Sequence, residues 1–271
     1  MKTSCKRGGP PSAGRPGSRP RATYSTTGAF RGPRVFRSAA RPAPTGLESG
    51  CLMLFHRVDD VGPEDEAVHG VLALFAERGL PAIAAVIPEH LRRGTVRALW
   101  RTPAVAVFQH GVAHVNRARP RDYHDEFPAH LGARTIGDEL ARGREILEQR
   151  LGVSVNGYVP PWNRTSGVAH AALARLGFEI LSGNRRYRPR TVLRRQDISI
   201  DVVTGCAPVR FRSMDAVMAD LRAASAGQES VGIMYHVQRT GSAGVRFVEE
   251  LLRRMEELGF PARGAVSPGP R

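Results

Sequence analysis

The most constraining feature of the sequence is a regular alternation of short apolar runs and longer amphipathic segments from residue 50 onward. Short apolar runs bounded by turn residues predict buried strands, and longer segments with helical spacing predict helices. This alternation is typical of an α/β fold with a mostly parallel sheet, open or closed into a barrel. Strands are predicted at 51–57, 81–87, 104–109, 155–159, 178–182, 197–203 and 230–236. Helices are predicted at 65–78, 94–101, 135–150, 167–176, 213–225 and 243–258.

The start of the chain has a different composition. The 271 residues carry a formal net charge of +15, and residues 1–45 hold ten Lys or Arg and no Asp or Glu. A segment this rich in Pro, Gly, Ser and Arg buries too little apolar surface to offset its ordering entropy. We therefore predict a disordered basic tail at 1–47, a barrel domain at 48–265 and a flexible C-terminus at 266–271.

The charge distribution also limits the function classes. A basic tail could make the chain a nucleic-acid-associated protein, but confinement of the excess charge to this tail counts against specific nucleic-acid recognition. No apolar core follows the positive start and no apolar stretch reaches eighteen residues, so neither a secretory signal nor a transmembrane helix is expected. Three widely spaced cysteines favour a reduced, cytoplasmic chain. The oligomeric state stays open.

Residues that could carry chemistry follow two of the predicted strands. The first strand ends in Asp59 and Asp60. These adjacent carboxylates repel each other, and contact with water, an arginine or a metal cation would offset that repulsion. Alone, this pair also fits a solvated acidic turn. The third strand is followed by His110 and His114, whose imidazoles can both reach one cation from a helical turn. Because catalytic groups collect at the carboxyl ends of barrel strands, one carboxylate and two imidazoles predict a Zn²⁺-type site.

Two later strands also end in polar motifs. Pro160 and Pro161 remove two donors, so Trp162 supplies the first free N–H of its loop. Such an N–H suits stabilisation of an oxyanion, and a plain Pro-Pro turn with a packed tryptophan gives the same pattern. The last strand ends at His236, which fits either a satisfied rim residue or a general acid.

Together the four motifs resemble the polysaccharide deacetylase family, the NodB-homology carbohydrate esterases. Val-Asp-Asp-Val-Gly-Pro is similar to the family's first motif, Thr-Phe-Asp-Asp-Gly, and His-x-x-x-His matches its second. Tyr-Val-Pro-Pro-Trp is similar to the third motif, Arg-x-Pro-x, and Ile-Met-Tyr-His to the last, an apolar run ending in Leu-His. The motifs follow the family's order over roughly residues 50 to 240.

The resemblance implies a distorted (β/α)7-type barrel with one divalent metal ion, Zn²⁺ being favoured. Asp60, His110 and His114 would hold the metal. Asp59 would be the general base that takes a proton from the attacking water, and His236 would protonate the departing amine.

The third motif carries the remaining implied roles. The N–H of Trp162 would help to hold the developing oxyanion. Contacts to an N-acetylated carbohydrate or glycoconjugate substrate are expected from Tyr158, Pro161, Asn163 and Arg164.

The chain departs from the family pattern at several positions. Val159 stands where the third motif carries the arginine that orients the base, and Arg57, Arg117 and Arg164 are the alternatives that could replace it. The family's Asp-x-x-Asp-Trp motif has only Asp201 as its nearest counterpart. This drift indicates a divergent branch with its own substrate.

The sequence is best interpreted as a metal-dependent N-deacetylase that releases acetate from an N-acetylated amino sugar or glycoconjugate. One alternative is a deacylase of a small-molecule or lipid-linked amino sugar. Another is a catalytically silent carbohydrate-binding barrel. The presence of Asp59 and His236 favours an enzyme.

Overall fold

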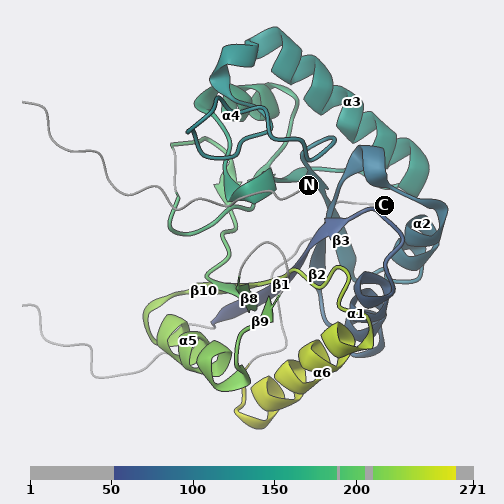
Figure 1. Cartoon of the computed structure of the whole chain (residues 1–271), viewed down its shortest axis with the longest axis vertical. Coiled ribbons are helices and arrows are strands. Elements are labelled where there is room, and N and C mark those ends of the chain that lie inside the picture. Colours follow the sequence, from purple (N-terminus) through teal and green to yellow (C-terminus); the bar gives the residue numbers. More distant parts are fainter. Residues whose placement is uncertain (1–51, 188–189, 205–209, 261–271) are drawn as a thin grey trace, which may run out of the picture. The chain divides into compact units, whose positions relative to one another are not determined.

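A computed structural model of the chain describes residues 52–187, 190–204 and 210–260. Eight strands of these residues form a parallel sheet in the order β6-β5-β4-β3-β2-β1-β10-β7, and six α-helices lie outside it (Figure 1). The predicted tail and the flexible C-terminus fall outside the described residues. Within the described ranges, no helix has the length and apolar character needed to cross a membrane.

The observed elements follow the predicted alternation closely. The sheet strands are β1 (Met53–Val61), β2 (Ala82–Val86), β3 (Val105–His110), β4 (Gly157–Val159), β5 (Ile180–Leu181), β6 (Arg194–Arg195), β7 (Ile200–Asp201) and β10 (Ser230–Tyr235). A separate antiparallel pair joins β8 (Val203–Thr204) and β9 (Arg210–Phe211). The α-helices are α1 (Glu66–Glu77), α2 (Arg93–Trp100), α3 (Ala133–Leu151), α4 (Gly167–Arg175), α5 (Met214–Gly227) and α6 (Ser242–Glu257).

One segment of the chain links the two ends of the sheet. Its first part, β6, pairs with β5, and its last part, β7, pairs with β10. Between them, the backbone N–H of Ile198 donates to Gly183 O at 2.9 Å, and that of Ser199 donates to Gly232 O at 2.8 Å. With β6 and β7 counted as one strand position, the sheet curls into a distorted seven-position barrel. The predicted fold class is confirmed.

Side-chain alternation separates the inside of the barrel from the helical layer. Phe55 belongs to a buried cluster drawn from strand positions around the barrel: Phe55, Ile83, Ala85, Ala106, Phe108, Val159, Ile180, Ile198 and Met234. Its neighbour Leu54 belongs instead to the larger core between the sheet and the helices. Because successive side chains of a strand point to opposite faces, Arg57 and Asp59 share the inner face with Phe55.

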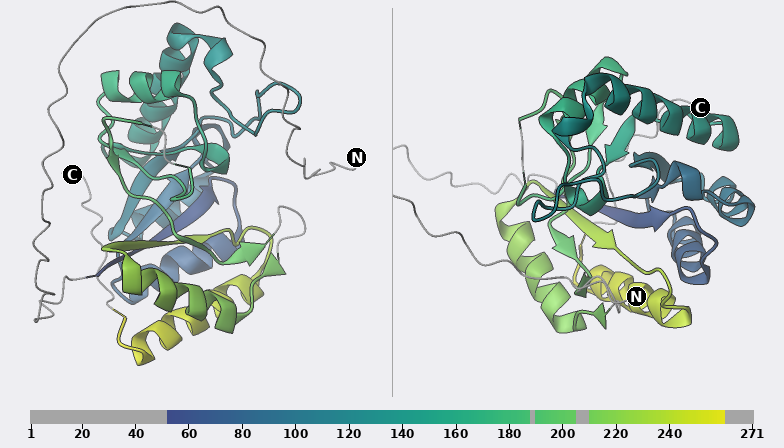
Figure 2. Two further views of the ribbon diagram at one scale, coloured as in Figure 1. Left: turned by 90° about the vertical axis from the view of Figure 1, so that its left-hand side faces the viewer. Right: turned by 45° about the horizontal axis from the view of Figure 1, so that its top comes forward.

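Five of the helices form a continuous layer outside the sheet. α6, α1, α2, α3 and α4 pack successively against one another, and α5 packs on β7 and β10 (Figure 2). The helices α1, α4 and α5 are capped at their N-termini by Asp65, Ser166 and Ser213. Each of these side chains accepts a hydrogen bond from a backbone N–H of the first turn. This layer leaves the carboxyl ends of the strands to the connecting loops.

Candidate metal centre and active site

A bulge at the end of β1 brings both acids to the site. The pairing of β1 with β2 shifts register between Val58 and Val61, and Asp60 has a φ of 56°. A left-handed conformation is uncommon for a residue other than glycine, and a bulge re-aims the side chains around it. Asp59 stays on the inner face while Asp60 turns towards two histidines. Val61 resumes the pairing with β2.

The first group of side chains is a three-donor cluster. Asp60 Oδ1 lies 3.1 Å from His110 Nε2 and 3.2 Å from His114 Nε2. The ligand atoms of the three residues all lie within 4.8 Å of one another. His110 ends β3, and its Nδ1 lies 2.9 Å from Val159 O. Because a carbonyl only accepts, that nitrogen carries a proton, so in the neutral form of the ring the Nε2 lone pair faces the cluster.

The charge states of this cluster suit a cation. Burial raises the pKa of Asp60, but the hydrogen bond from His110 and the neighbouring imidazoles outweigh it, so the pKa lies well below its ordinary range. Burial and the nearby His110 lower the pKa of His114 to about 4, which keeps its ring neutral at pH 7. Burial lowers the pKa of His110, but Asp60 and Asp59 raise it by more, so the pKa is higher than that of a free histidine. A proton and a cation would therefore compete at His110.

The donor set fits a divalent ion by its chemistry. One carboxylate and two imidazoles, with positions left for other ligands, are typical of hydrolytic zinc sites and accept other divalent ions as well.

The second group is a buried ion pair on β1. Arg57 is fully buried and Asp59 is 1% exposed. Arg57 Nε donates to Asp59 Oδ1 at 2.7 Å, and its Nη2 donates to Asp59 Oδ2 at 2.9 Å. Ser182 O and Asn163 Oδ1 accept two further hydrogen bonds from the guanidinium, at 2.9 and 2.6 Å. This planar fork fixes the orientation of the Asp59 carboxylate.

This bidentate contact identifies which of the three candidate arginines orients the Asp59 carboxylate. Arg57 orients Asp59, two residues away on the same inner face. Arg117 pairs with Glu139 at 2.7 Å. The guanidinium of Arg164 stacks 3.8 Å from the ring centroid of Tyr123.

His236 follows β10 and lies between two carboxylates. Its Nε2 is 3.7 Å from Asp59 Oδ2, and its Nδ1 is 3.7 Å from Asp201 Oδ1. Burial lowers the pKa of His236, but Asp201 and Asp59 more than compensate and raise it to about 9. The imidazolium form therefore prevails at neutral pH. Asp201 ends β7, so its position beside His236 is set by the strand that links the two ends of the sheet.

Trp162 lies against the metal cluster. It belongs to a short 3-10 turn, Pro161–Asn163, and has a φ of 54°. Its ring centroid is 4.6 Å from that of His114 and 5.2 Å from that of His124. The loop after β4 therefore packs on the second histidine of the cluster.

The four expected substrate contacts differ in their accessibility. Tyr158 is fully buried in the outer core, and its ring faces Phe178 across 6.1 Å, so it does not reach a substrate and we exclude it from the site. Pro161 is also buried. Asn163 and Arg164 are half-buried. Asn163 accepts the hydrogen bond from Arg57, so its side chain supports the ion pair directly.

Glu126, in the long loop before α3, is a site residue that the motifs do not reveal. The residue is 2% exposed, and its carboxylate accepts from the backbone N–H groups of Val112, Ala113 and His114 at 3.2, 2.8 and 3.1 Å. It approaches Gly111 so closely that a Cβ there would lie 1.8 Å from Glu126 Oε2. Glu126 thus anchors the turn that carries both histidines.

Comparisons with known proteins concern the fold. No family model and no curated protein matches the chain. A family 4 acetyl xylan esterase from Clostridium thermocellum, solved with a cobalt ion, is similar over 76% of this chain and 85% of its own, with a TM-score of 0.53 and 13% identity. A family 4 carbohydrate esterase from Streptococcus mutans is similar over 79% and 85%, with a TM-score of 0.54 and 15% identity. The chain has the polysaccharide deacetylase fold.

The polysaccharide deacetylase fold does not by itself establish activity. A family 4 pseudoenzyme from Bacillus anthracis is similar over 76% of this chain and 61% of its own, with a TM-score of 0.52 and 11% identity. Because this fold serves both enzymes and a pseudoenzyme, the function must be argued from the side chains of the site.

Proposed function

We propose that the chain is a metal-dependent amide hydrolase that removes the acetyl group of an N-acetylated amino sugar or glycoconjugate. The observation that carries this proposal is the Asp60, His110 and His114 cluster beside an oriented carboxylate, Asp59, with His236 3.7 Å from it. The cobalt ion reported for the similar Clostridium thermocellum esterase supports a divalent metal at such a site.

The residues divide the chemistry between them. A divalent ion held by Asp60, His110 and His114, with Zn²⁺ favoured, would polarise the acetamide carbonyl and ease deprotonation of water. Asp59 accepts the proton of the water that attacks the carbonyl carbon, in an orientation fixed by Arg57. The negative charge then moves to the former carbonyl oxygen.

The second half of the reaction breaks the C–N bond. The backbone N–H of Trp162 donates to the oxyanion. His236, an imidazolium at neutral pH, gives its proton to the departing nitrogen, so the products are acetate and a free amine. Asn163 and Arg164, which directly follow Trp162 and are half-buried, are the proposed substrate contacts.

Metal content tests the proposal without knowledge of the substrate. We expect about one divalent ion per chain in the wild type by elemental analysis, and its loss in His110→Ala/His114→Ala, because the cluster supplies the ligands. His130→Ala, which changes an exposed histidine outside the cluster, is the matched control. A wild type that stays metal-free after incubation with Zn²⁺ would contradict the proposal.

Acetate release separates an enzyme from a silent barrel of the same fold. The metal-loaded protein is incubated with N-acetylglucosamine oligomers and with small-molecule N-acetylated amino sugars, and acetate is measured. Release from either group supports the proposed activity and indicates the substrate class. A metal-loaded chain that binds these sugars and releases no acetate would be a carbohydrate-binding protein.

The raised pKa of His236 predicts the alkaline limit of activity. Because the proton donor is present only below its pKa of about 9, we expect turnover to fall as the pH rises through that value. In Asp201→Asn, a carboxylate that raises this pKa is lost, so the alkaline limb should move to lower pH. The measurement is the pH profile of kcat for both proteins. An unchanged alkaline limb in Asp201→Asn would remove His236 as the group titrating there.

Glu126 is expected to control metal affinity. Glu126→Gln removes the charge that accepts three backbone N–H groups of the histidine turn, so Zn²⁺ affinity should fall about 10–100-fold. Affinity is measured by competition with a chromophoric chelator. Asp122→Asn, an exposed change in the same loop, should leave it unaltered. Equal affinities in wild type and Glu126→Gln would show that the turn holds without this anchor.

A further inference from the structure

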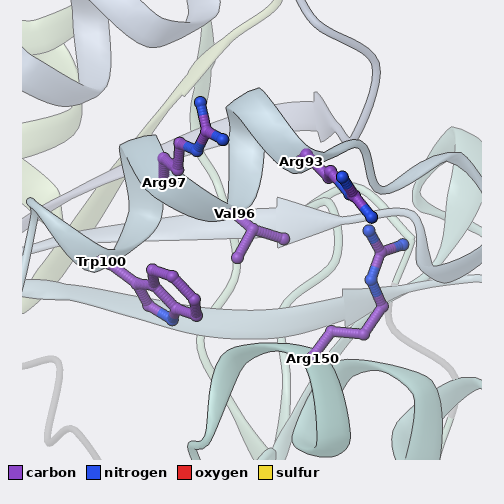
Figure 3. A pocket seen from close by; sticks show the side chains of 5 residues that line it. All are labelled: Arg93, Val96, Arg97, Trp100 and Arg150. Atoms are coloured by element: carbon purple, nitrogen blue, oxygen red, sulfur yellow. The ribbon is translucent and has the colours of Figure 1, made fainter.

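A pocket lies on the outer layer of the barrel, between α2 and the C-terminal half of α3. It has a volume of about 430 Å³ and is lined by Arg93, Val96, Arg97, Trp100 and Arg150 (Figure 3). None of these residues belongs to the metal cluster or to the Asp59 and His236 pair. The pocket is therefore separate from the proposed active site and differs from it in composition.

The charged side chains that line it are all arginines. Arg93, Arg97 and Arg150 are exposed, and none forms an ion pair with a carboxylate of the described residues. The guanidinium groups of Arg93 and Arg150 point toward one another (Figure 3). An anion bound between the two facing guanidinium groups would relieve their repulsion, and guanidinium groups suit the geometry of phosphate.

The neighbouring carboxylates interact with groups other than the arginines of the pocket. Glu64 accepts a hydrogen bond from the backbone N–H of Gly94 at 2.8 Å. Glu89 pairs with Arg142 at 2.6 Å. Neither carboxylate neutralises the pocket through an ion pair with its arginines.

The other end of the pocket is aromatic. Trp100 is 63% exposed, yet its Nε1 donates to Leu151 O at 3.1 Å, which holds one edge of the indole against the end of α3. Arg150 is held in turn by a hydrogen bond to Leu91 O. Buried Val96 lies between the two ends. Arg93 and Trp100 are seven residues apart on α2, which corresponds to about 10 Å along the helix axis.

We propose that this pocket binds a phosphate ester of a ring compound. The phosphate lies between Arg93 and Arg150, and the ring stacks on the open face of Trp100. A sugar phosphate and a nucleoside monophosphate share this chemistry, because both place an apolar ring face within reach of a doubly charged phosphate. The pocket is independent of the metal centre, so it goes beyond the proposed hydrolase activity.

Binding is measured by isothermal titration of the full chain at low salt. The probes are N-acetylglucosamine 6-phosphate and adenosine 5′-monophosphate, and the comparison ligands are N-acetylglucosamine, adenosine and inorganic phosphate. The variants are Arg93→Gln/Arg150→Gln and Trp100→Ala. Arg101→Gln is the matched control, because Arg101 is an exposed arginine at the end of the same helix that does not line the pocket.

We expect saturable binding of at least one ester, weaker binding of the ligands that lack phosphate or ring, and a decrease in affinity with added salt. Affinity should fall at least about tenfold in Arg93→Gln/Arg150→Gln, fall in Trp100→Ala, and stay unchanged in Arg101→Gln. The ester that binds more tightly identifies the source of the phosphate. His110→Ala/His114→Ala should bind it as the wild type does, so failure of the metal centre and failure of this pocket are distinguishable.

Three results would overturn the proposal. One is the absence of saturable binding for both esters. Another is an equal loss of affinity in Arg101→Gln and in Arg93→Gln/Arg150→Gln, which would indicate general attraction to a basic surface. The third is inorganic phosphate binding as tightly as the esters together with no effect of Trp100→Ala, which would exclude a ring on the indole.

Discussion

Arg57→Leu is expected to lower the free energy of unfolding by about 3–5 kcal/mol, the largest stability effect that the site predicts. The change leaves the Asp59 carboxylate, which is 1% exposed, without the guanidinium that bonds both of its oxygens. It also removes the donors to Ser182 O and Asn163 Oδ1. Chemical denaturation of the variant and the wild type under the same conditions measures the difference.

Two comparison variants isolate the cause. Arg57→Leu/Asp59→Leu removes both charges, so it should lose less stability than the single change, because no uncompensated charge stays buried. Arg142→Leu breaks an ion pair with Glu89 in which both side chains are more than a third exposed, and we expect a loss of about 1 kcal/mol or less. An Arg57→Leu protein as stable as the wild type would show that the buried pair is not required.

The fold could be predicted because a strand that is buried on both faces of a sheet reads as an apolar run in the sequence. β1, β2, β3 and β10 all begin or end close to the predicted positions. β6 and β9 could not be found in this way. Each has two residues, Arg194–Arg195 and Arg210–Phe211, so neither leaves an apolar pattern. Closure of the sheet into a barrel depends on β6. Without the family resemblance, the sequence therefore does not distinguish a barrel from an open sheet.

The metal cluster was the most predictable part of the site. His110 and His114 are close in sequence, and the end of β1 must lie near the end of β3 when parallel strands are separated only by β2. The partner of Asp59 was less predictable, since three arginines were available and only the inner-face register of β1 selects Arg57. Alternation also explains Tyr158: its neighbour Val159 belongs to the inner cluster, so the tyrosine points into the outer core.

Glu126 marks the limit of pattern-based reasoning. Its role depends on how a long loop without periodicity folds back on the turn after β3. The only sequence signals were the length of that loop and Gly111, whose missing Cβ makes room for the carboxylate. Neither signal identifies the partner. Loop-borne anchors of this kind require the structure.

Asp59→Asn is expected to reduce turnover by at least roughly 10²–10⁴, while the metal content stays at the wild-type value. The amide cannot accept the proton of the attacking water, whereas the cluster of Asp60, His110 and His114 keeps its donor atoms. Acetate release and elemental analysis on the same preparation measure the two properties. Because an amide leaves the buried Arg57 without its counter-charge, the free energy of unfolding should also fall, so both measurements are made well below the melting temperature.

Asp60→Asn is the matched variant one residue away, and it should show the opposite order of effects. It weakens a metal ligand, so metal content should fall first and turnover should fall with it, and excess Zn²⁺ should restore part of the activity. Excess Zn²⁺ should restore nothing in Asp59→Asn, because the missing group is a proton acceptor. If Asp59→Asn lost the metal while Asp60→Asn kept it, the roles of the two carboxylates would be exchanged, and the bulge at the end of β1 would have to present them in the reverse order.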